Sequence, residues 1–544
     1  MLRHTLQAAA VVLLLPLAAM AQGGTSHSRD VARGIELFAD IYRQLDLFYV
    51  DTISADTVVR MAIEGMLDEM DPYTVYYEGD DQDELRTMAT GRYAGIGALI
   101  RYISSEDRAA IDQLYEGCPA QTAGLRTGDI IQTIDGKDVK GWDNRRVSQA
   151  LRGEPGSTFE LRVRRAGVKK PLSFRITRQQ IQLPAVPWHG MVDSTRHVGY
   201  VRLSSVTDQC SRDVRYAVAT LKEQGMTSLV LDLRGNPGGS LQEAVEIVGF
   251  FVPKGSLVVS TKGKLPSACR DYLTPAEPID TVMPIAVLVN ETSASAAEII
   301  SGTMQDMDRA TIIGQRTYGK GLVQAVRETA YGGQLKITTS RYYIPSGRCI
   351  QAYDYRHRTV DGAATTLPDS LTREFRTRKG RIVRDGGGIQ PDSIVADEMM
   401  PAMVSDLAAS EACFRYLSHF MAQHESIDAP CSFRLTDDDY AAFVDTICAS
   451  DFTYTGRSVQ VLATLQQVLR YEGRADAFAS QLAELEHQLS HTDMRSDLML
   501  FRPWIQKVLE TEIVSRYYYQ SGGLRHSLQF DDCLHKAVQT LTRQ

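Results

Sequence analysis

The hydrophobic pattern divides the chain into regions with different periods. From about residue 28 to residue 90, apolar side chains recur every three to four positions, which predicts amphipathic helices. The clearest such stripe comprises Ile35, Phe38, Ile41, Tyr42 and Leu45. Ser54 or Asp56 is a candidate N-cap for a second helix that should end before Pro72. We expect a helical N-terminal module over 28–90 that contains an acidic linker, "EGDDQDEL", after about Tyr77.

Short strands and turns follow between residues 91 and 180. "GRYAGIGALIRY" places glycines before and inside an apolar strand, and Gly128-Asp129 and Asp135-Gly136 predict turns. "DNRRVSQALRG" predicts a helix and "STFELRVRRAG" a strand. This region resembles a PDZ domain, and "GLRTGDIIQTIDG" is the most specific part of the resemblance.

Strands and helices alternate from residue 181 to residue 395. "TSLVLDL" and "PIAVLVN" are continuously apolar, as expected for parallel strands covered on both faces. "SLQEAVEIVGFFV" and "AAEIISGTMQDM" predict helices between such strands. The pattern indicates a layered α/β domain with much parallel sheet.

The remaining region, 396–544, is mainly helical and shows no catalytic constellation. We expect it to dock on the core, to mediate homo-oligomer formation or to bind an adaptor protein. His487 and His491 lie four positions apart on a predicted helix, after Glu484. A solvated polar face explains this spacing better than a metal site does.

The amino terminus predicts export. Arg3 and His4 precede an apolar stretch, and Ala19-Met20-Ala21 suits cleavage, so residues 1–21 read as a signal peptide rather than a buried helix. The stretch is short for a membrane span, and no later segment is long and apolar enough to form one. We therefore expect a protein of the periplasm or cell envelope.

Charge and cysteine content narrow the function further. The net charge of −8 argues against a nucleic-acid-binding surface. The eight cysteines are scattered and include no CxxC pair, so their spacing argues against a zinc site. Disulfides and free buried thiols both remain open.

Three short segments could carry chemistry. In "VLVNETSASAAEII" a buried strand leads into a helix, so Ser293 or Ser295 is either a nucleophile at a helix N-terminus or simply an N-cap. The segment Arg234–Gly239, "RGNPGG", can offer backbone N–H groups to a ligand or form a plain turn. Lys320, between two glycines, is either an exposed turn residue or a buried lysine whose pKa would fall, so that it could accept a serine proton.

Together these segments resemble the C-terminal processing peptidases, or tail-specific proteases, which are PDZ-containing serine peptidases. The "SASAAE" string at 293–298 matches the family pattern except at Ala297, and Lys320 follows Ser295 by 25 positions in a Gly-Lys-Gly segment. "TTSRYYIPSGRCIQ" and "GGGIQPD" also match, and the resemblance covers about residues 30–395. It implies a crotonase- or Clp-like peptidase core over 181–395.

The resemblance also implies roles for individual residues. Ser295 would be the nucleophile, Lys320 the general base and Gln324 the residue that orients the lysine. Backbone N–H groups of Gly239 and Ala296 would form the oxyanion hole, with Gly238 an open alternative for the first. No metal or organic cofactor is implied.

Helix geometry makes Asp306 a structural residue rather than part of this group. It would lie about 16 Å from Ser295 if the two share one helix.

The PDZ-like region suggests the partner. Backbone N–H groups of Gly95, Ile96 and Gly97 would hold the terminal carboxylate of a substrate tail added as an extra strand. The expected activity is cleavage of proteins near their C-termini. The rival interpretations are a PDZ scaffold without catalysis and a crotonase-like thioester enzyme, and the latter needs neither the Ser-Lys pair nor the PDZ region.

Overall fold

The computed structural model describes residues 26–359, 361–396, 400–490 and 493–542. The chain forms two compact units, one up to Tyr76 and one from Tyr77 onward. The predicted signal peptide, residues 1–21, lies outside the described residues. Within them, no helix has both the length and the apolar character needed to cross a bilayer.

The described part of the first unit, from residue 26 onward, contains two helices, as the apolar spacing predicts. They are α3 (His27–Phe48) and α4 (Ala55–Asp68), and the three-residue strand β1 (Val75–Tyr77) follows. Ser54 is the N-cap of α4, and its side chain accepts a hydrogen bond from the Thr57 N–H. Helix α4 ends before Pro72, as expected.

The predicted acidic linker is wrong, because most of it forms the helix α5 (Asp81–Thr90). Asp81, Asp83 and Glu84 all lie in its first turn, where negative charge is favoured by the helix dipole. Gly91 ends the helix in a left-handed conformation with φ 67°. Acidic residues concentrated at a helix N-terminus were misread as a solvated linker.

The PDZ-like region folds around a sheet of antiparallel strands ordered β3-β4-β5-β7-β8, with the short β6 paired to β5. Helix α7 (Asn144–Leu151) is capped by Asp143 and packs Val147 and Leu151 into the core. The other elements are β2 (Arg92–Gly95), β3 (Ala98–Ile103), β4 (Arg108–Leu114), α6 (Pro119–Thr122), β5 (Ile130–Ile134), β6 (Lys137–Asp138), β7 (Thr158–Arg164), β8 (Leu172–Thr177) and β9 (Gln179–Gln182). These strands and helices fall where the sequence predicts them.

The α/β region contains a six-stranded sheet ordered β10-β11-β12-β15-β16-β23, parallel from β11 to β23. Its strands are β10 (His189–Asp193), β11 (Val198–Arg202), β12 (Ser228–Asp232), β15 (Ile285–Val289), β16 (Thr311–Gly314) and β23 (Ser393–Ile394). Its helices are α8 (Cys210–Glu223), α9 (Leu241–Gly249) and α10 (Ala296–Asp306). All residues of β12 and β15 are buried, which explains their continuous apolar sequence.

A second sheet and two hairpins complete this region. The second sheet contains β13 (Leu257–Gly263), β14 (Arg270–Leu273), β17 (Leu322–Glu328) and β18 (Gln334–Tyr343). The hairpins are β19 (Tyr353–Arg358) with β20 (Ala364–Thr366), and β21 (Glu374–Arg376) with β22 (Ile382–Arg384).

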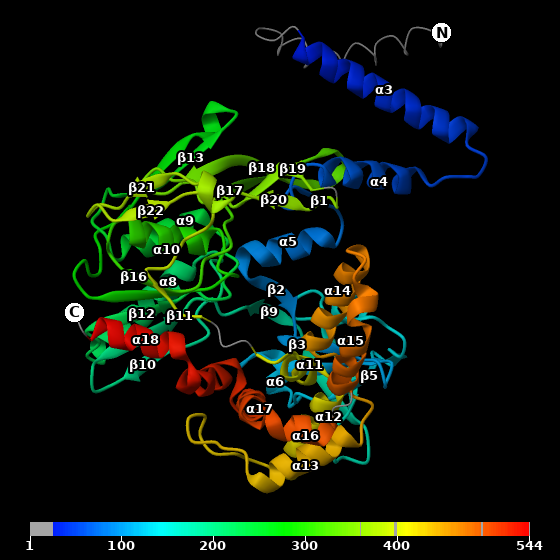
Figure 1. Ribbon diagram of the computed structural model, residues 1–544. Coiled ribbons are helices and arrows are strands. Elements are labelled where there is room, and N and C mark those ends of the chain that lie inside the picture. The colour runs from blue at the N-terminus through cyan, green and yellow to red at the C-terminus, as the bar shows by residue number, and fades with distance from the viewer. Residues whose placement is uncertain (1–25, 360, 397–399, 491–492, 543–544) are drawn as a thin grey trace. The chain divides into compact units, whose positions relative to one another are not determined.

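The last region is helical, as predicted. Its helices are α11 (Ala402–Ala409), α12 (Glu411–Gln423), α13 (Asp437–Cys448), α14 (Arg457–Tyr471), α15 (Ala475–Ser490), α16 (Met494–Leu500), α17 (Arg502–Ser527) and α18 (Asp532–Leu541). Most of them surround their own apolar core. Helix α18 instead packs Leu534, Ala537 and Leu541 on the six-stranded sheet, and Figure 1 shows it in red beside β10 to β12.

The cysteines form no disulfide. All eight lie within the described ranges.

Candidate active site

Two turns leave adjacent parallel strands at the same edge of the six-stranded sheet. We call them the β12 turn (residues 234–239) and the β15 turn (residues 290–295), and Asp232 pairs with Leu288 where the strands end. The turns are joined by two hydrogen bonds. The Gly235 N–H donates to Asn290 Oδ1 (2.9 Å), and the Ala294 N–H donates to the Asn236 carbonyl (2.9 Å). Carboxyl ends of parallel strands are where α/β folds place their ligand sites.

Ser295 ends the β15 turn in a strained conformation. Its φ of 55° and ψ of −116° are unusual for a residue with a side chain, and Ala296 begins α10 directly after it. Such strain is found where a fold holds a reactive side chain in a fixed direction. The half-buried Ser295 hydroxyl therefore stands at a helix N-terminus, as the sequence predicts.

The nearby Ser293 has a different role. Its side chain is fully buried, and the hydroxyl donates to the Leu233 carbonyl (2.8 Å) while accepting from the Asn290 N–H (3.0 Å). These bonds tie the start of the β12 turn to the β15 turn. Of the two serines that the sequence left open, Ser293 is thus the structural one.

Glu298 connects the serine to the lysine segment. Its buried carboxylate accepts from the Ser295 N–H (2.8 Å), the Thr317 hydroxyl (2.6 Å), the Gly319 N–H (2.7 Å) and the Lys320 N–H (2.9 Å). Burial raises the pKa of this carboxyl to about 6, although all four bonds oppose that effect. Sequence reasoning assigned Glu298 no role, but its position three residues after a serine at a helix start is the signature of a capping box.

Lys320 is half-buried in the loop before β17. Its neighbour Gly319 has φ 87°, and a Cβ there would lie 2.4 Å from the Ala352 Cβ, so only glycine fits. Gln324 lies on β17, and its Nε2 donates to the Thr338 hydroxyl (3.0 Å). Gln324 and Lys320 therefore belong to one continuous segment, the loop before β17 and β17 itself. The role of Gln324 in orienting the lysine stays a prediction.

The β12 turn contains both glycines that are candidates for the first oxyanion-binding amide, and their hydrogen bonds differ. The Gly238 N–H donates to Asn236 Oδ1 (2.8 Å), so it is already engaged. Among the described residues, neither the Gly239 nor the Ala296 amide donates to another protein group. A Cβ at Gly238 would lie 2.7 Å from the Ala296 nitrogen, which shows how tightly this turn presses on the start of α10. The geometry favours Gly239 with Ala296 as a pair of anion-binding amides.

Asp306 lies away from this group, as the helix geometry predicts. Its carboxylate is buried, pairs with the Arg348 guanidinium (2.8 Å) and accepts from the Ser346 N–H (2.9 Å). These contacts fix the far end of α10 to the segment after β18.

A groove in the PDZ-like region lies between β3 and α7. It has a volume of about 380 Å³, and its lining includes Gly95, Ile96, Leu99 and Ser148. Strand β3 is at the edge of its sheet, so a tail could pair with it. At the end of the groove, Gly97 turns with φ 74° and Ile96 is buried in the domain core.

Tyr93 reaches into the loop that was predicted to hold a carboxylate. A Cβ at Gly95 would lie 2.8 Å from the Tyr93 ring. Burial with the neighbouring Tyr115 and Cys118 raises the pKa of Tyr93 to about 12, while the nearby Gly97 backbone acts in the opposite direction. The phenol therefore lies beside one of the predicted carboxylate-binding amides.

The described residues contain no group of three His, Cys, Asp or Glu side chains that could hold a metal ion. Of the helical pair considered from sequence, His487 lies on α15 and His491 lies outside the described residues.

Comparisons with known proteins agree with this arrangement. The model of peptidase family S41 matches residues 197–357, a PDZ domain model matches 111–165, and a model of the C-terminal helical domain of probable PDZ-proteases matches 403–541. Among solved structures, the photosystem II D1 C-terminal processing protease shares 27% identity, with 67% of this chain and 94% of that one covered and a TM-score of 0.36. The PDZ domain of a carboxy-terminal protease from Vibrio cholerae, solved with a peptide, shares 32% identity over 17% of this chain and 99% of its own, with a TM-score of 0.16.

Curated relatives match more than half of the chain. A probable CtpA-like serine protease of Staphylococcus aureus is 33% identical over 316 residues, which are 57% of this chain and 61% of the relative. The carboxy-terminal-processing protease of Bartonella bacilliformis is 33% identical over 348 residues, which are 63% of this chain and 79% of the relative. The chain thus belongs to the family of C-terminal processing peptidases, which are PDZ-containing serine endopeptidases.

Proposed function

We propose that Ser295 and Lys320 form the catalytic pair of this peptidase. The observation that carries the proposal is the Glu298 carboxylate, which binds the backbone amides of both Ser295 and Lys320. It fixes the two segments against each other, and Ser295 is held there in a strained conformation with a positive φ.

The reaction follows from these positions. Ser295 Oγ attacks the scissile carbonyl carbon while Lys320 Nζ, in its neutral form, takes the hydroxyl proton. The oxyanion that forms is held by the N–H groups of Gly239 and Ala296. When the C–N bond breaks, Lys320 returns the proton to the leaving amine. Lys320 then deprotonates a water molecule that attacks the acyl-enzyme, and as the ester C–O bond breaks it gives this proton to Ser295 Oγ, which restores the free serine and the neutral lysine. Gln324 orients the lysine in this scheme.

Substrate choice is assigned to the PDZ groove. A protein tail would pair with the edge of β3, its terminal carboxylate would meet the loop of Gly95, Ile96 and Gly97, and its last apolar side chain would enter the groove. We place the enzyme outside the cytoplasm, in the periplasm or cell envelope, because of the signal-like sequence at residues 1–21. The boundaries predicted from sequence, 28–90, 91–180, 181–395 and 396–544, stay proposals.

Two measurements test this function on the purified chain. A fluorophosphonate probe should label Ser295, as located by peptide mapping, and labelling should quicken with rising pH as Lys320 loses its proton. A peptide with a free apolar C-terminus should be cleaved faster than its amidated twin. Label at another serine, or labelling that is independent of pH from 6 to 9, would refute the Ser-Lys pair. Peptide binding without label or cleavage would indicate a scaffold, and equal cleavage of both peptides would refute tail selection.

A further inference from the structure

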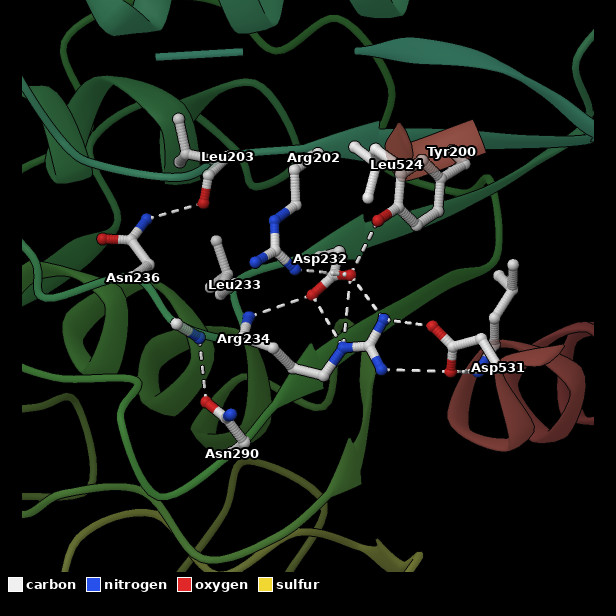
Figure 2. A network of polar contacts seen from close by, with 12 residues as sticks. Tyr200, Arg202, Leu203, Asp232, Leu233, Arg234, Asn236, Asn290, Leu524 and Asp531 are labelled. Atoms are coloured by element: carbon white, nitrogen blue, oxygen red, sulfur yellow. Dashed lines mark hydrogen bonds and ion pairs between the residues drawn. The ribbon is translucent and has the colours of Figure 1, made fainter. Parts of the chain in front are cut away.

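Arg234, the first residue of the β12 turn, lies between two carboxylates (Figure 2). On one side its guanidinium donates to Asp232 from Nη2 (2.6 Å) and Nε (3.0 Å). On the other side it donates to Asp531 in a two-point contact, Nη1 to Oδ1 (3.0 Å) and Nη2 to Oδ2 (2.5 Å). Paired contacts of this kind fix the plane of the guanidinium as well as its position.

Asp232 is itself saturated with partners, so it cannot move to follow Arg234. It is fully buried, accepts from the Tyr200 hydroxyl (2.7 Å) and pairs with Arg202 (2.8 Å). Burial alone would raise the pKa of Asp232, but Arg234 and Arg202 lower it to about 2. The formal charges of the two arginines and the two aspartates cancel. Asp531 is the member of this network that comes from the C-terminal helical region.

The residues after Arg234 carry this constraint into the site. The Gly235 N–H donates to Asn290, and Asn236 binds the Leu203 carbonyl through Nδ2 (2.9 Å) and the Gly238 N–H through Oδ1 (2.8 Å). Gly239 follows, and among the described residues its amide donates no hydrogen bond to the protein. The direction of that amide thus depends on where the turn begins.

Asp531 is held by the helix that it caps. Its Oδ1 accepts from the Leu534 N–H (2.9 Å), and α18 is seated on the sheet by Leu534, Ala537 and Leu541 beside Tyr200 and Leu288. Side-chain exposure is 13% for Asp531 and 21% for Arg234, so solvent screens the pair only partly. A helix of the C-terminal region therefore supplies a fixed anchor to the catalytic edge of the sheet.

We infer that Asp531 is a positioning residue for the oxyanion hole, acting through Arg234 on the β12 turn, and that α18 is part of the active-site scaffold. The inference rests on the proposed function, in which Gly239 supplies one of the two oxyanion-binding amides. It assigns the C-terminal helical region a part in catalysis that its lack of catalytic residues conceals.

The substitution Asp531→Asn separates this role from simple helix capping. Asparagine is as good an N-cap as aspartate, so α18 should stay folded. Its amide nitrogen, however, would face an Arg234 N–H, and one of the two contacts would become donor against donor. Asp493→Asn is the matched control, because Asp493 caps α16 through the Ser496 N–H (3.0 Å) within the helical region.

The test compares the full-length wild type with both variants by steady-state kinetics, thermal unfolding and amide hydrogen exchange of residues 235–240. For Asp531→Asn we expect kcat to fall about tenfold or more with KM changed less than about twofold, because a misaligned oxyanion hole weakens transition-state binding. Exchange in residues 235–240 should be faster, while the melting temperature stays close to that of Asp493→Asn. The control should match the wild type in kcat and exchange.

The outcomes separate this inference from the proposed function. Unchanged kcat in folded Asp531→Asn overturns the inference, whatever the exchange data show. Equal losses of kcat in both variants overturn it too, because they would indicate general destabilisation. A wild type that neither cleaves peptides nor reacts at Ser295 refutes the proposed function instead. In that case unchanged exchange in Asp531→Asn refutes the coupling, and faster exchange supports it.

Discussion

The β12 and β15 turns start from equivalent places on neighbouring strands, yet they are held in different ways. Beside its bonds to the β12 turn, the β15 turn is fixed from nearby, since Glu298 belongs to the helix that begins at Ala296 and Ser293 also binds Asn290 in its own turn. The β12 turn is fixed by Asp531, which is 297 positions further along the chain. The proposed nucleophile is thus held largely by local structure, whereas we infer that the proposed oxyanion hole depends on a distant helix.

The largest effect on catalysis should appear when the two serines of the β15 turn are each replaced by alanine in separate variants. Ser295→Ala should lower kcat at least about a thousandfold, since no hydroxyl is left to form the acyl-enzyme. Lys320→Ala should do the same while the chain stays folded. Ser293→Ala should keep probe labelling but lower the free energy of unfolding by about 1–3 kcal/mol, because the Leu233 carbonyl loses its donor. Labelling rates and urea unfolding measure these effects, and loss of labelling in folded Ser293→Ala would reverse the assignment.

The remote support of the β12 turn can be weakened without touching its charges. Leu534 is 4% exposed, and Leu534→Ala should lower the free energy of unfolding by about 2–5 kcal/mol. Leu417→Ala, at a position 3% exposed in the core of the helical region, should cost about as much. Only the first should also lower kcat at a temperature where both variants are folded. Equal kcat values in the two variants would mean that the packing of α18 on the sheet does not affect the β12 turn.

The local support of the β15 turn should respond to pH. In the folded chain the pKa of Glu298 is raised from 4.5 to about 6, so the folded state binds this proton more tightly than the unfolded state does. Stability from this group is therefore greatest below pH 4.5 and is lost as pH rises through about 6, by ~2 kcal/mol in all. Glu298→Gln should remove that pH dependence, which urea unfolding at several pH values would measure.

Glu298→Gln should also lower kcat about tenfold, which corresponds to an activation free energy higher by ~1.4 kcal/mol. The reason is that an amide group cannot accept all four hydrogen bonds that the carboxylate accepts. Glu243→Gln is the control, since Glu243 follows Ser240 with the same spacing at the start of α9 and accepts from the Ser211 N–H. An equal loss of kcat in the control would show that the effect is not specific to the β15 turn.

The smallest effect should come from the PDZ groove, outside both turns. Tyr93→Phe removes the phenol oxygen that lies beside the Gly97 backbone, where a substrate carboxylate is proposed to bind. KM for a peptide with a free C-terminus should fall a few-fold, corresponding to about 1 kcal/mol, with kcat unchanged. The amidated peptide should show no gain. A similar change for both peptides would mean that Gly97 does not contact the carboxylate.

Local patterns explain which parts of the candidate site sequence reasoning could propose. The apolar strand before Ser295, the small residues of its turn and the glycines beside Lys320 are visible within a few positions of each residue. The same holds for the helical and strand regions, whose periods follow from local side-chain direction. The acidic helix α5 was missed because its charges indicated a linker, although they lie in a first helical turn.

Long-range pairing explains what sequence reasoning did not reach. Nothing near Asp531 distinguishes it from the other aspartates that cap helices here, such as Asp143 and Asp493. Its importance comes from Arg234, and their proximity is a property of the tertiary fold. The choice of Gly239 over Gly238 likewise needed the contact from Asn236, which only the three-dimensional arrangement reveals.

The distance in sequence between Arg234 and Asp531 also has a consequence for biosynthesis. The ribosome makes the strands, both turns and the serine long before it makes α18, and domains generally fold in the order of their synthesis. Contacts across 297 positions are slow to form, because a long loop must close first. Under the proposed function, the nascent chain would therefore contain its proposed nucleophile for some time without an aligned oxyanion hole. A protease that accepts unfolded tails would thus be kept inactive while it is itself an unfolded chain.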